Sequence, residues 1–271
     1  KLSMNVASLP MYDLPEAAAA TEALLRGLAR HFAGSGIEDV PAELLRRPPL
    51  PEHWLSPDLL FSQTCGYPFR NAIKGRVRLL ATPCYDAAGA EGPNYRSLVL
   101  VRADAREQSL AEFKGATAAF NSTDSQSGYN ARRFLVAPLA QDGRFFGKTV
   151  ETGGHALSLA AVAAGDADVA AVDCVSYALF QRYRRPQMAK VRVLCSTPSA
   201  PGLPYVTAGD SDPERLSKLR DGLRAAMADP ALAAAREALL LRDVMLLPDS
   251  AYERMDEMEA AAVARGYPAL G

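Results

Sequence analysis

The stretch that decides the fold is TGGHALSLAAVAAGDADVAAVD, residues 152–173. Its pattern predicts the end of a strand, a tight loop at Gly153-Gly154, a short Ala-rich helix that Gly165 closes, and a buried strand that stops at Asp173. Short β-like runs alternate with helical patterns in this way along nearly the whole chain. This alternation is typical of βαβ units and predicts an α/β fold with mostly parallel sheets.

Working outward from this stretch, the chain divides into two lobes. Its 271 residues, 49% of them hydrophobic, suffice for two domains with cores of their own and exclude a disordered chain. A second set of βαβ units begins after Arg102, and prolines break the pattern again near Pro204. We therefore predict an outer lobe of residues 1–102 and 204–271 with an inserted lobe of residues 103–203, joined by a double hinge. The predicted strands are residues 5–9, 58–62, 77–82, 95–102, 117–121, 148–152, 169–173 and 191–196.

Two helices carry clear signals. The first is expected to begin after Asp13, whose carboxylate can cap it, with Pro15 in the first turn and Glu16 completing a capping box. Apolar residues recur at helical spacing in that helix and in one that opens at residues 211–214, which predicts one buried face on each. The predicted buried residues are Leu24, Leu25, Leu28, Phe32, Leu216, Leu219, Leu223 and Met227.

Composition excludes several classes of function. The 30 basic and 31 acidic side chains leave a formal charge of -1, which argues against a general nucleic-acid binder. No stretch reaches the ~20 apolar residues that a membrane-spanning helix needs. No phosphate-binding or dinucleotide-binding glycine motif occurs, so we expect no cofactor. The sequence Lys1-Leu2-Ser3 resembles either a vector remnant or the stub of a processed leader, and Met4 could be the natural start, so a periplasmic and a cytoplasmic location both stay open.

Cysteine and histidine are too sparse to suggest a metal site. The four cysteines are widely spaced, and we interpret Cys174 and Cys195 as small buried side chains, while a bridge between Cys65 and Cys84 is possible in an oxidising compartment. Of the three histidines, His31 and His53 have exposed-looking surroundings, so we expect no metal.

The most informative loop is residues 120–130, in which a strand end runs through seven polar side chains into a helix. Free N–H groups and a partial positive charge at a helix N-terminus can hold an anion or a carbonyl oxygen, and serine hydroxyls add donors. A helix cap alone would need only one such residue. The polar run therefore favours ligand binding, with Asn121, Ser125, Gln126, Ser127 and Gly128 as the predicted contacts.

Other candidates follow other strands, because ligands of open α/β sheets bind beyond the carboxyl ends of the strands. Each of them also has a structural interpretation, as a packed ring, a chain turn or a helix cap. Asp173, for example, could simply cap the helix that begins at Cys174. These further candidates are Tyr12, Thr64, Cys65, Tyr67, His155 and Asp173.

The arrangement of residues 152–173, the Ser-rich loop and the return at residues 201–206 resembles the phosphate/phosphonate branch of ABC-transporter substrate-binding proteins. The resemblance covers almost the whole chain. It implies a two-lobed type-II periplasmic-binding-protein fold, each lobe a mostly parallel sheet flanked by helices, with a small ligand clamped between lobes that close about the double hinge. It also implies a membrane permease as partner, a periplasmic location and a monomeric protein.

One residue departs from the family pattern. Family members hold the anion with a Ser-Thr-Ser-Gly-Tyr-like loop, which residues 125–129 match in part, but Asp124 places a carboxylate beside it that would repel phosphate unless it points away. We therefore expect a small polar ligand that is phosphonate-like and anionic or zwitterionic, while the carboxylate also leaves an amidic or aromatic ligand open. Two alternatives stay open: an enzyme on the same fold that uses Cys65 and His155 as nucleophile and base, and a stand-alone ligand sensor.

Overall fold

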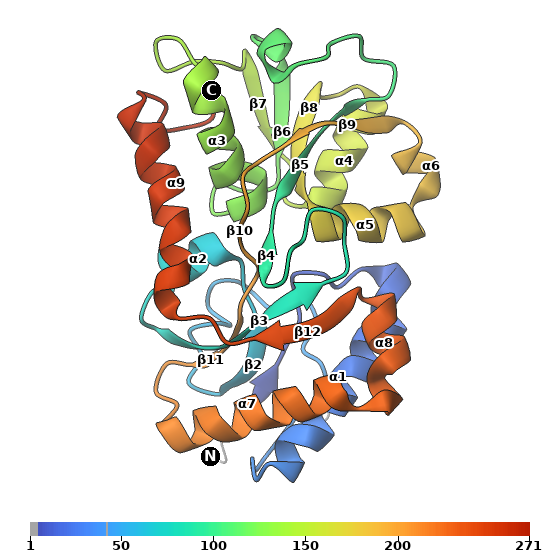
Figure 1. Ribbon diagram of the computed structural model, residues 1–271, viewed down its shortest axis with the longest axis vertical. Helices are drawn as coiled ribbons and strands as arrows, with labels where there is room; N and C mark the ends of the chain where they lie inside the picture. Colours follow the sequence, from blue (N-terminus) through green and yellow to red (C-terminus); the bar gives the residue numbers. More distant parts are fainter. Residues whose placement is uncertain (1–4, 42) are drawn as a thin grey trace. The chain divides into compact units, whose positions relative to one another are not determined.

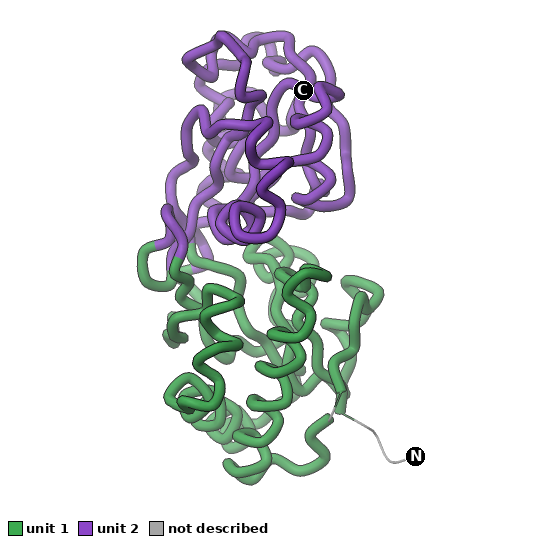
Figure 2. The backbone as a smooth tube through the Cα atoms, turned by 90° about the vertical axis from the view of Figure 1, so that its right-hand side faces the viewer, with its two compact units in different colours: residues 1–86, 91–93, 201–251 green, residues 87–90, 94–200, 252–271 purple. Residues whose placement is uncertain are grey.

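The computed structural model describes residues 5–41 and 43–271, so the predictions for Lys1 to Met4 lie outside the described residues. The chain forms two compact units, coloured separately in Figure 2. Unit 1 comprises residues 1–86, 91–93 and 201–251, and unit 2 comprises residues 87–90, 94–200 and 252–271. These boundaries differ from the predicted ones, because β5 (Ser97–Arg102) pairs within the sheet of unit 2 and the last twenty residues also pack there.

Unit 1 is built on a five-stranded sheet with the order β1-β2-β11-β3-β12. Strands β1, β2 and β3 run in one direction, and β11 and β12 run in the other. The ends of the first three strands therefore meet the starts of the last two at one edge of the sheet. The strands are β1 (Val6–Ala7), β2 (Leu59–Gln63), β3 (Val77–Tyr85), β11 (Tyr205–Ala208) and β12 (Leu241–Met245).

Helices α1 (Ala18–Gly34) and α7 (Pro213–Ala228) of unit 1 lie side by side (Figure 1). A Cβ atom at Gly222 would stand 2.8 Å from Cδ1 of Phe32, so glycine permits the close approach of the two helices. All eight apolar residues predicted to be buried on these helices are buried. The Phe32 ring contacts Phe61 on β2, with ring centroids 5.5 Å apart, which ties α1 to the sheet.

The predicted cap of the first helix is wrong. A 3-10 turn, η1 (Pro15–Ala17), precedes α1, and Leu14 occupies its N-cap position without a side-chain hydrogen bond. The carboxylate of Asp13 instead forms an ion pair with Arg46 from the Pro-rich connection. A charged partner competes for the oxygen that a helix cap would use.

Unit 2 has a second five-stranded sheet, with the order β7-β6-β8-β5-β9. Four strands run in one direction and only β5 opposes them. The predicted α/β class is confirmed, and both sheets are mixed with most strands in one direction. The other strands are β6 (Thr117–Phe120), β7 (Lys148–Glu151), β8 (Val169–Asp173) and β9 (Val191–Ser196).

Helix α4 (His155–Ala164) packs on β8, and it ends where the sequence predicts, at Gly165 with φ 84°. That left-handed conformation favours glycine. On another side of unit 2, α3 (Ala131–Val136) lies beside α9 (Glu253–Ala264), which the last segment of the chain supplies (Figure 1). The core between them includes Val136, Phe146 and Tyr267.

The remaining elements are short. A two-stranded sheet of β4 (Asn94–Tyr95) and β10 (Ala200–Pro201) lies where the chain passes between the units. The others are α2 (Gly66–Arg70), α5 (Cys174–Tyr183), α6 (Arg185–Met188), α8 (Ala233–Ala238), the π-helix η3 (Gln126–Asn130), and the 3-10 turns η2 (Leu110–Phe113), η4 (Ala137–Leu139), η5 (Pro230–Leu232) and η6 (Asp249–Tyr252). Within residues 5–41 and 43–271, no helix combines the length and the apolar character needed to cross a membrane.

Candidate functional site

Polar residues gather at one edge of the sheet of unit 2. Strands β6, β7 and β8 end at this edge, and β5, which runs the opposite way, begins there. Asn121 follows β6, His155 follows β7 after a short loop, and Asp173 ends β8. The topology thus brings together three candidates that lie far apart in the sequence.

The loop after β6 enters a helix through an irregular first turn. Ser125 is extended and is the N-cap, its hydroxyl accepting a hydrogen bond from the Gly128 N–H at 3.0 Å. Residues 126–130 then form a π-helix that continues directly into α3. π-Helical turns are rare and often mark functional sites. The first turn leaves backbone N–H groups without helical acceptors, as an anion site requires.

Gly128 is needed because its neighbours approach its Cα closely. An added Cβ would lie 1.9 Å from Oδ1 of Asn121 and 3.3 Å from Cε1 of His155. The Oδ1 atom of Asn121 is buried and has no hydrogen-bond partner among the described residues. The missing side chain at 128 therefore lets the loop after β6 and the start of α4 meet at one point.

Ser127, His155 and Asp173 form a connected group. Oγ of Ser127 lies 2.8 Å from Nε2 of His155, and Oδ2 of Asp173 lies 3.4 Å from the same nitrogen. The other carboxylate oxygen of Asp173 accepts hydrogen bonds from the N–H groups of Val175 and Ser176, so Asp173 also caps α5. Both interpretations of Asp173, as helix cap and as neighbour of the site, are compatible with this geometry.

This group is not a catalytic triad. A triad needs the serine on one imidazole nitrogen and the carboxylate on the other. Here both partners approach Nε2, while Nδ1 is buried and has no hydrogen-bond partner among the described residues. The carboxylate therefore does not hold the imidazole as a base for Ser127.

The electrostatic surroundings lower the pKa of His155. Burial is the main cause because it disfavours the imidazolium, and the positive charge of Arg132 acts in the same direction. Asp173 opposes both by favouring the charged form. His155 is therefore neutral at pH 7.

The carboxylate of Asp124 is not a buried charge within the loop. Its side chain is exposed and accepts a hydrogen bond from Oγ of Ser122. An exposed carboxylate is screened by water and weakly repels an anion held by the buried residues of the same loop. The departure from the family pattern is thus compatible with an anionic ligand.

The Gln126 side chain contacts other residues of unit 2. Its Oε1 accepts a hydrogen bond from Asn130, and its Nε2 lies 3.2 Å from the sulfur of Met258 on α9. These contacts fix the start of the π-helix against α9.

Two residues of this edge were missed from the sequence. Ser97 begins β5, and its hydroxyl donates to the carbonyl of Ser127 at 2.9 Å. The hydroxyl of Thr197, just after β9, accepts from the N–H of Ser97. The only signal in the sequence was a polar residue, Ser97, at the start of a predicted strand. It indicates the site only when β5 is known to run antiparallel to β8 and β9.

Unit 1 holds the other predicted residues at the corresponding edge of its own sheet. Tyr12 follows β1 and contacts the Tyr85 ring edge-on, with centroids 5.2 Å apart. Thr64 is fully buried, whereas Cys65 and Tyr67 are partly exposed at the start of α2. A narrow crevice at this edge is lined by Leu9, Tyr12, Thr21, Leu24, Gln63, Tyr85, Tyr205, Leu239 and Leu241. Its polar members Gln63, Tyr85 and Tyr205 were not predicted.

The cysteines and histidines differ from expectation in two respects. None of the four cysteines forms a disulfide, so the possible bridge between Cys65 and Cys84 is not formed. His53 is buried instead of exposed, with Nε2 2.6 Å from Oγ of Ser8, and burial lowers its pKa. Cys65 belongs to unit 1 and His155 to unit 2.

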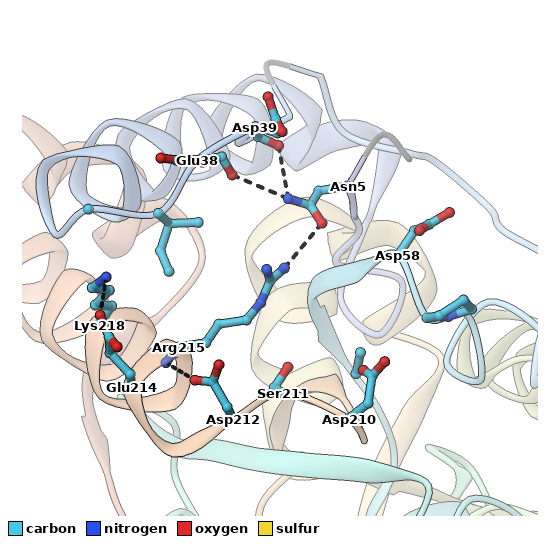
Figure 3. A pocket seen from close by; sticks show the side chains of 14 residues that line it. Asn5, Glu38, Asp39, Asp58, Asp210, Ser211, Asp212, Glu214, Arg215 and Lys218 are labelled. Atoms are coloured by element: carbon cyan, nitrogen blue, oxygen red, sulfur yellow. Dashed lines mark hydrogen bonds and ion pairs between the residues drawn. The ribbon is translucent and has the colours of Figure 1, made fainter. Parts of the chain in front are cut away.

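A pocket of about 610 Å³ lies elsewhere in unit 1, around Asn5 and the start of α7 (Figure 3). Arg215 in this pocket donates a hydrogen bond to Asn5, and Lys218 pairs with Glu214. Its two cations are outnumbered by six carboxylates, those of Glu38, Asp39, Asp58, Asp210, Asp212 and Glu214. A pocket with this excess of negative charge disfavours an anion.

A family profile confirms the resemblance seen in the sequence. Residues 58–255 match the family described as ABC transporter, phosphonate, periplasmic substrate-binding protein. The chain belongs to this family. It is thus a substrate-binding component of the transporter type, and the match includes the loop after β6, His155 and Asp173. A comparison with curated proteins found no match.

Solved structures share the fold of this family member at low sequence identity. A binding protein component of an ABC phosphonate transporter from Pseudomonas aeruginosa has a TM-score of 0.80 and 17% identity over 98% of this chain and 88% of that one. PhnD1 from Prochlorococcus marinus, in complex with methylphosphonate, has a TM-score of 0.78 and 13% identity over 95% and 98%. A Xanthomonas citri protein bound to ATP has a TM-score of 0.72 and 18% identity over 97% and 98%. These likenesses establish the two-lobed type-II fold.

Proposed function

We propose that the protein binds a phosphonate-type anion through the polar edge of unit 2 and delivers it to a membrane permease. The observation that carries the proposal is the N-terminal turn of the π-helix, with Ser125 and Ser127, next to the uncommitted Nδ1 of His155. A phosphonate oxygen can accept hydrogen bonds from backbone N–H groups, hydroxyls and an imidazolium together. The methylphosphonate named for PhnD1 supplies the first probe to test.

The donors of this edge suit a small anion better than a neutral solute. Uptake of a proton by His155 would place a positive charge at Nδ1 while Nε2–H donates toward Asp173, which keeps the imidazolium fully paired. The exposed position of Asp124 removes the main objection to an anion. A zwitterion such as 2-aminoethylphosphonate offers the same oxygens and belongs to the same test.

We further propose that Tyr12, Thr64, Cys65 and Tyr67 of unit 1 contact the ligand. They share one sheet edge with the tyrosine-lined crevice, and such edges bind ligands in open α/β sheets. Tyr12→Ala and Tyr67→Ala are each expected to weaken binding of methylphosphonate. Unchanged affinity in both variants would remove unit 1 residues from the site.

Calorimetric titration with methylphosphonate, 2-aminoethylphosphonate, phosphate, sulfate and glycine tests the ligand class. Ser127→Ala is expected to weaken phosphonate binding about 10- to 100-fold, because hydrogen bonds to charged groups contribute about 1.5–3 kcal/mol. Thr123→Ala, an exposed change in the same loop, is the matched control and should bind normally. Normal binding by Ser127→Ala, or preference for glycine, would contradict the proposal.

The same titrations address the enzyme alternative. A binding protein returns its ligand unchanged, so phosphonate recovered by mass spectrometry after long incubation should be chemically intact. Turnover that is lost in His155→Ala would instead support catalysis. Stimulation of a permease's ATP hydrolysis by the loaded protein, in proteoliposomes, tests the transport partner.

A further inference from the structure

Arg132, on α3, is a fully buried arginine in the core of unit 2. Its side chain is 0% exposed. Nη1 donates to the carbonyl of Ala119 at 2.7 Å, and the guanidinium carbon lies 5.6 Å from the centroid of the Phe146 ring. Nε and Nη2 have no hydrogen-bond partner among the described residues.

No carboxylate compensates this charge. Arg132 forms no ion pair with any residue in the described part of the chain, whereas its neighbour Arg133 pairs with Glu259. Burial lowers the pKa of Arg132 to about 10, so the group still carries its proton at pH 7. A buried charge without a partner is costly to the fold, and natural proteins pair such groups. The buried charge of Arg132 therefore lowers the stability of the fold, and packing alone does not explain why an arginine occupies this position.

The position of Arg132 relates it to the polar edge of unit 2. Its hydrogen-bond acceptor, Ala119, lies on β6 two residues before Asn121, and α3 continues directly from the π-helix that holds Ser127. Its charge is also felt at His155, whose pKa it lowers. The guanidinium is thus tied through β6 and α3 to the segments that hold Asn121 and Ser127, and its charge reaches His155.

We propose that Arg132 is the fixed positive charge that makes unit 2 selective for anions and, among anions, for dianions. Its charge acts on the ligand through the low-dielectric core, without contact to any ligand atom. Arg132 is therefore a specificity-determining residue that lies outside the ligand contacts. This inference rests on the proposed function, since it assumes that the anion binds at the loop after β6. The incoming anion is the counter-charge that the free protein lacks.

The proposal predicts opposite effects on stability and on binding. Replacing a lone buried charge by an apolar side chain of similar length often leaves the fold unchanged or more stable. Arg132→Met should therefore melt at the same or a higher temperature without ligand, yet bind anions more weakly. If Arg132 served the fold alone, Arg132→Met would lower both the melting temperature and the affinity for anions, because the fold itself would be destabilised.

Ligand charge is the second readout. Coulomb energy is proportional to the charge of the anion, so the fold-loss in Arg132→Met for a dianion should be about the square of the loss for a monoanion. At an effective dielectric constant of about 20 and a charge separation of about 12 Å, these losses are about tenfold for the monoanion and about a hundredfold for the dianion. Monomethyl methylphosphonate and methylphosphonate at pH 9 serve as the two probes. Arg102→Gln, which removes an exposed charge of the same unit, should bind both probes normally.

The outcomes separate this inference from the proposed function. Equal losses for the two probes, or a normal affinity of Arg132→Met beside a weakened Ser127→Ala, would overturn the role of Arg132 and leave the site intact. A lower melting temperature with unchanged charge preference would assign Arg132 to the fold alone. Failure of the wild type to bind any of the anions would overturn both.

Discussion

At the scale of single residues, small and polar side chains decide what the edge of unit 2 can do. Gly128 admits Asn121 and His155 to the same point, and Ser127 joins His155 to the helix turn. The sequence predicted these residues from their types and from the strands that precede them. It could not predict that both partners of His155 approach Nε2, because imidazole orientation depends on packing between segments far apart in the chain.

Gly128→Ala should destabilise the protein and weaken phosphonate binding. The new methyl group would overlap Oδ1 of Asn121, and overpacking of this kind costs about 1–3 kcal/mol. Denaturant unfolding measures the change. The double variant Asn121→Ala/Gly128→Ala removes the overlapping atoms and should recover much of the lost stability. Strictly additive effects would show that the two residues do not oppose each other.

His155 should make stability and binding depend on pH. Its folded-state pKa is lowered, so the unfolded chain binds more protons below pH ~6.5, and stability is lost as the pH falls from there through the folded pKa. Anion binding, by contrast, should weaken as the pH rises, because it draws a proton onto His155. The groups that face His155 are Asp173 and Arg132.

Sulfate is the suitable probe of that binding because its own charge is constant between pH 5 and 9. Titrations in buffers of different ionisation enthalpy should show proton uptake, and His155→Asn should abolish it. Part of the acid loss of stability should survive in this variant, since the pKa of His53 is lowered too. Proton uptake that persists in His155→Asn would contradict the assignment.

At the scale of elements, the site depends on how helices begin. The π-helix and α5 start with capping side chains, those of Ser125 and Asp173, at the same edge of the sheet. Capping signals are local, which is why the helices that follow the loop of residues 120–130, the Gly153-Gly154 turn and Asp173 could be predicted. The cap at Asp13 failed for a reason that is not local, namely its ion pair with Arg46.

Asp173→Ala should affect both stability and ligand binding. Loss of an N-cap costs about 1 kcal/mol, and the same change removes the carboxylate beside Nε2 of His155. Asp212→Ala is a matched control, because Asp212 caps α7 of unit 1 by accepting from the N–H of Arg215. It should lose similar stability and bind phosphonate normally. Similar binding by the two variants would confine Asp173 to its capping role.

At the scale of the whole molecule, ligand binding should stabilise the protein by mass action. Methylphosphonate at a hundred times its Kd should add about 2.7 kcal/mol, which raises Tm by about 5–10 °C for a chain of this size. Differential scanning fluorimetry measures the shift. Glycine at equal concentration should leave Tm unchanged, and a shift of equal size with glycine would contradict an anion site.

The division of the chain was predictable in outline and not in detail. The length of the chain, the alternating elements and the breaks near residues 102 and 204 indicated two lobes. The unit to which β5 and α9 belong depends on partners distant in the sequence: β5 pairs with β8 and β9, and α9 packs against α3. The local sequence near residues 102 and 252 does not indicate these partners.

The central strand of the unit 1 sheet, β11, comes from residues 205–208, between strands formed more than a hundred residues earlier. A growing polypeptide that ends before residue 205 therefore lacks the middle strand of this sheet. Unit 2 lacks the complete helix α9 until residue 264 has been added. Both units therefore need segments from late in this sequence before their sheet or core is complete. Folding therefore depends on pairings between segments far apart in the sequence, which makes it slow.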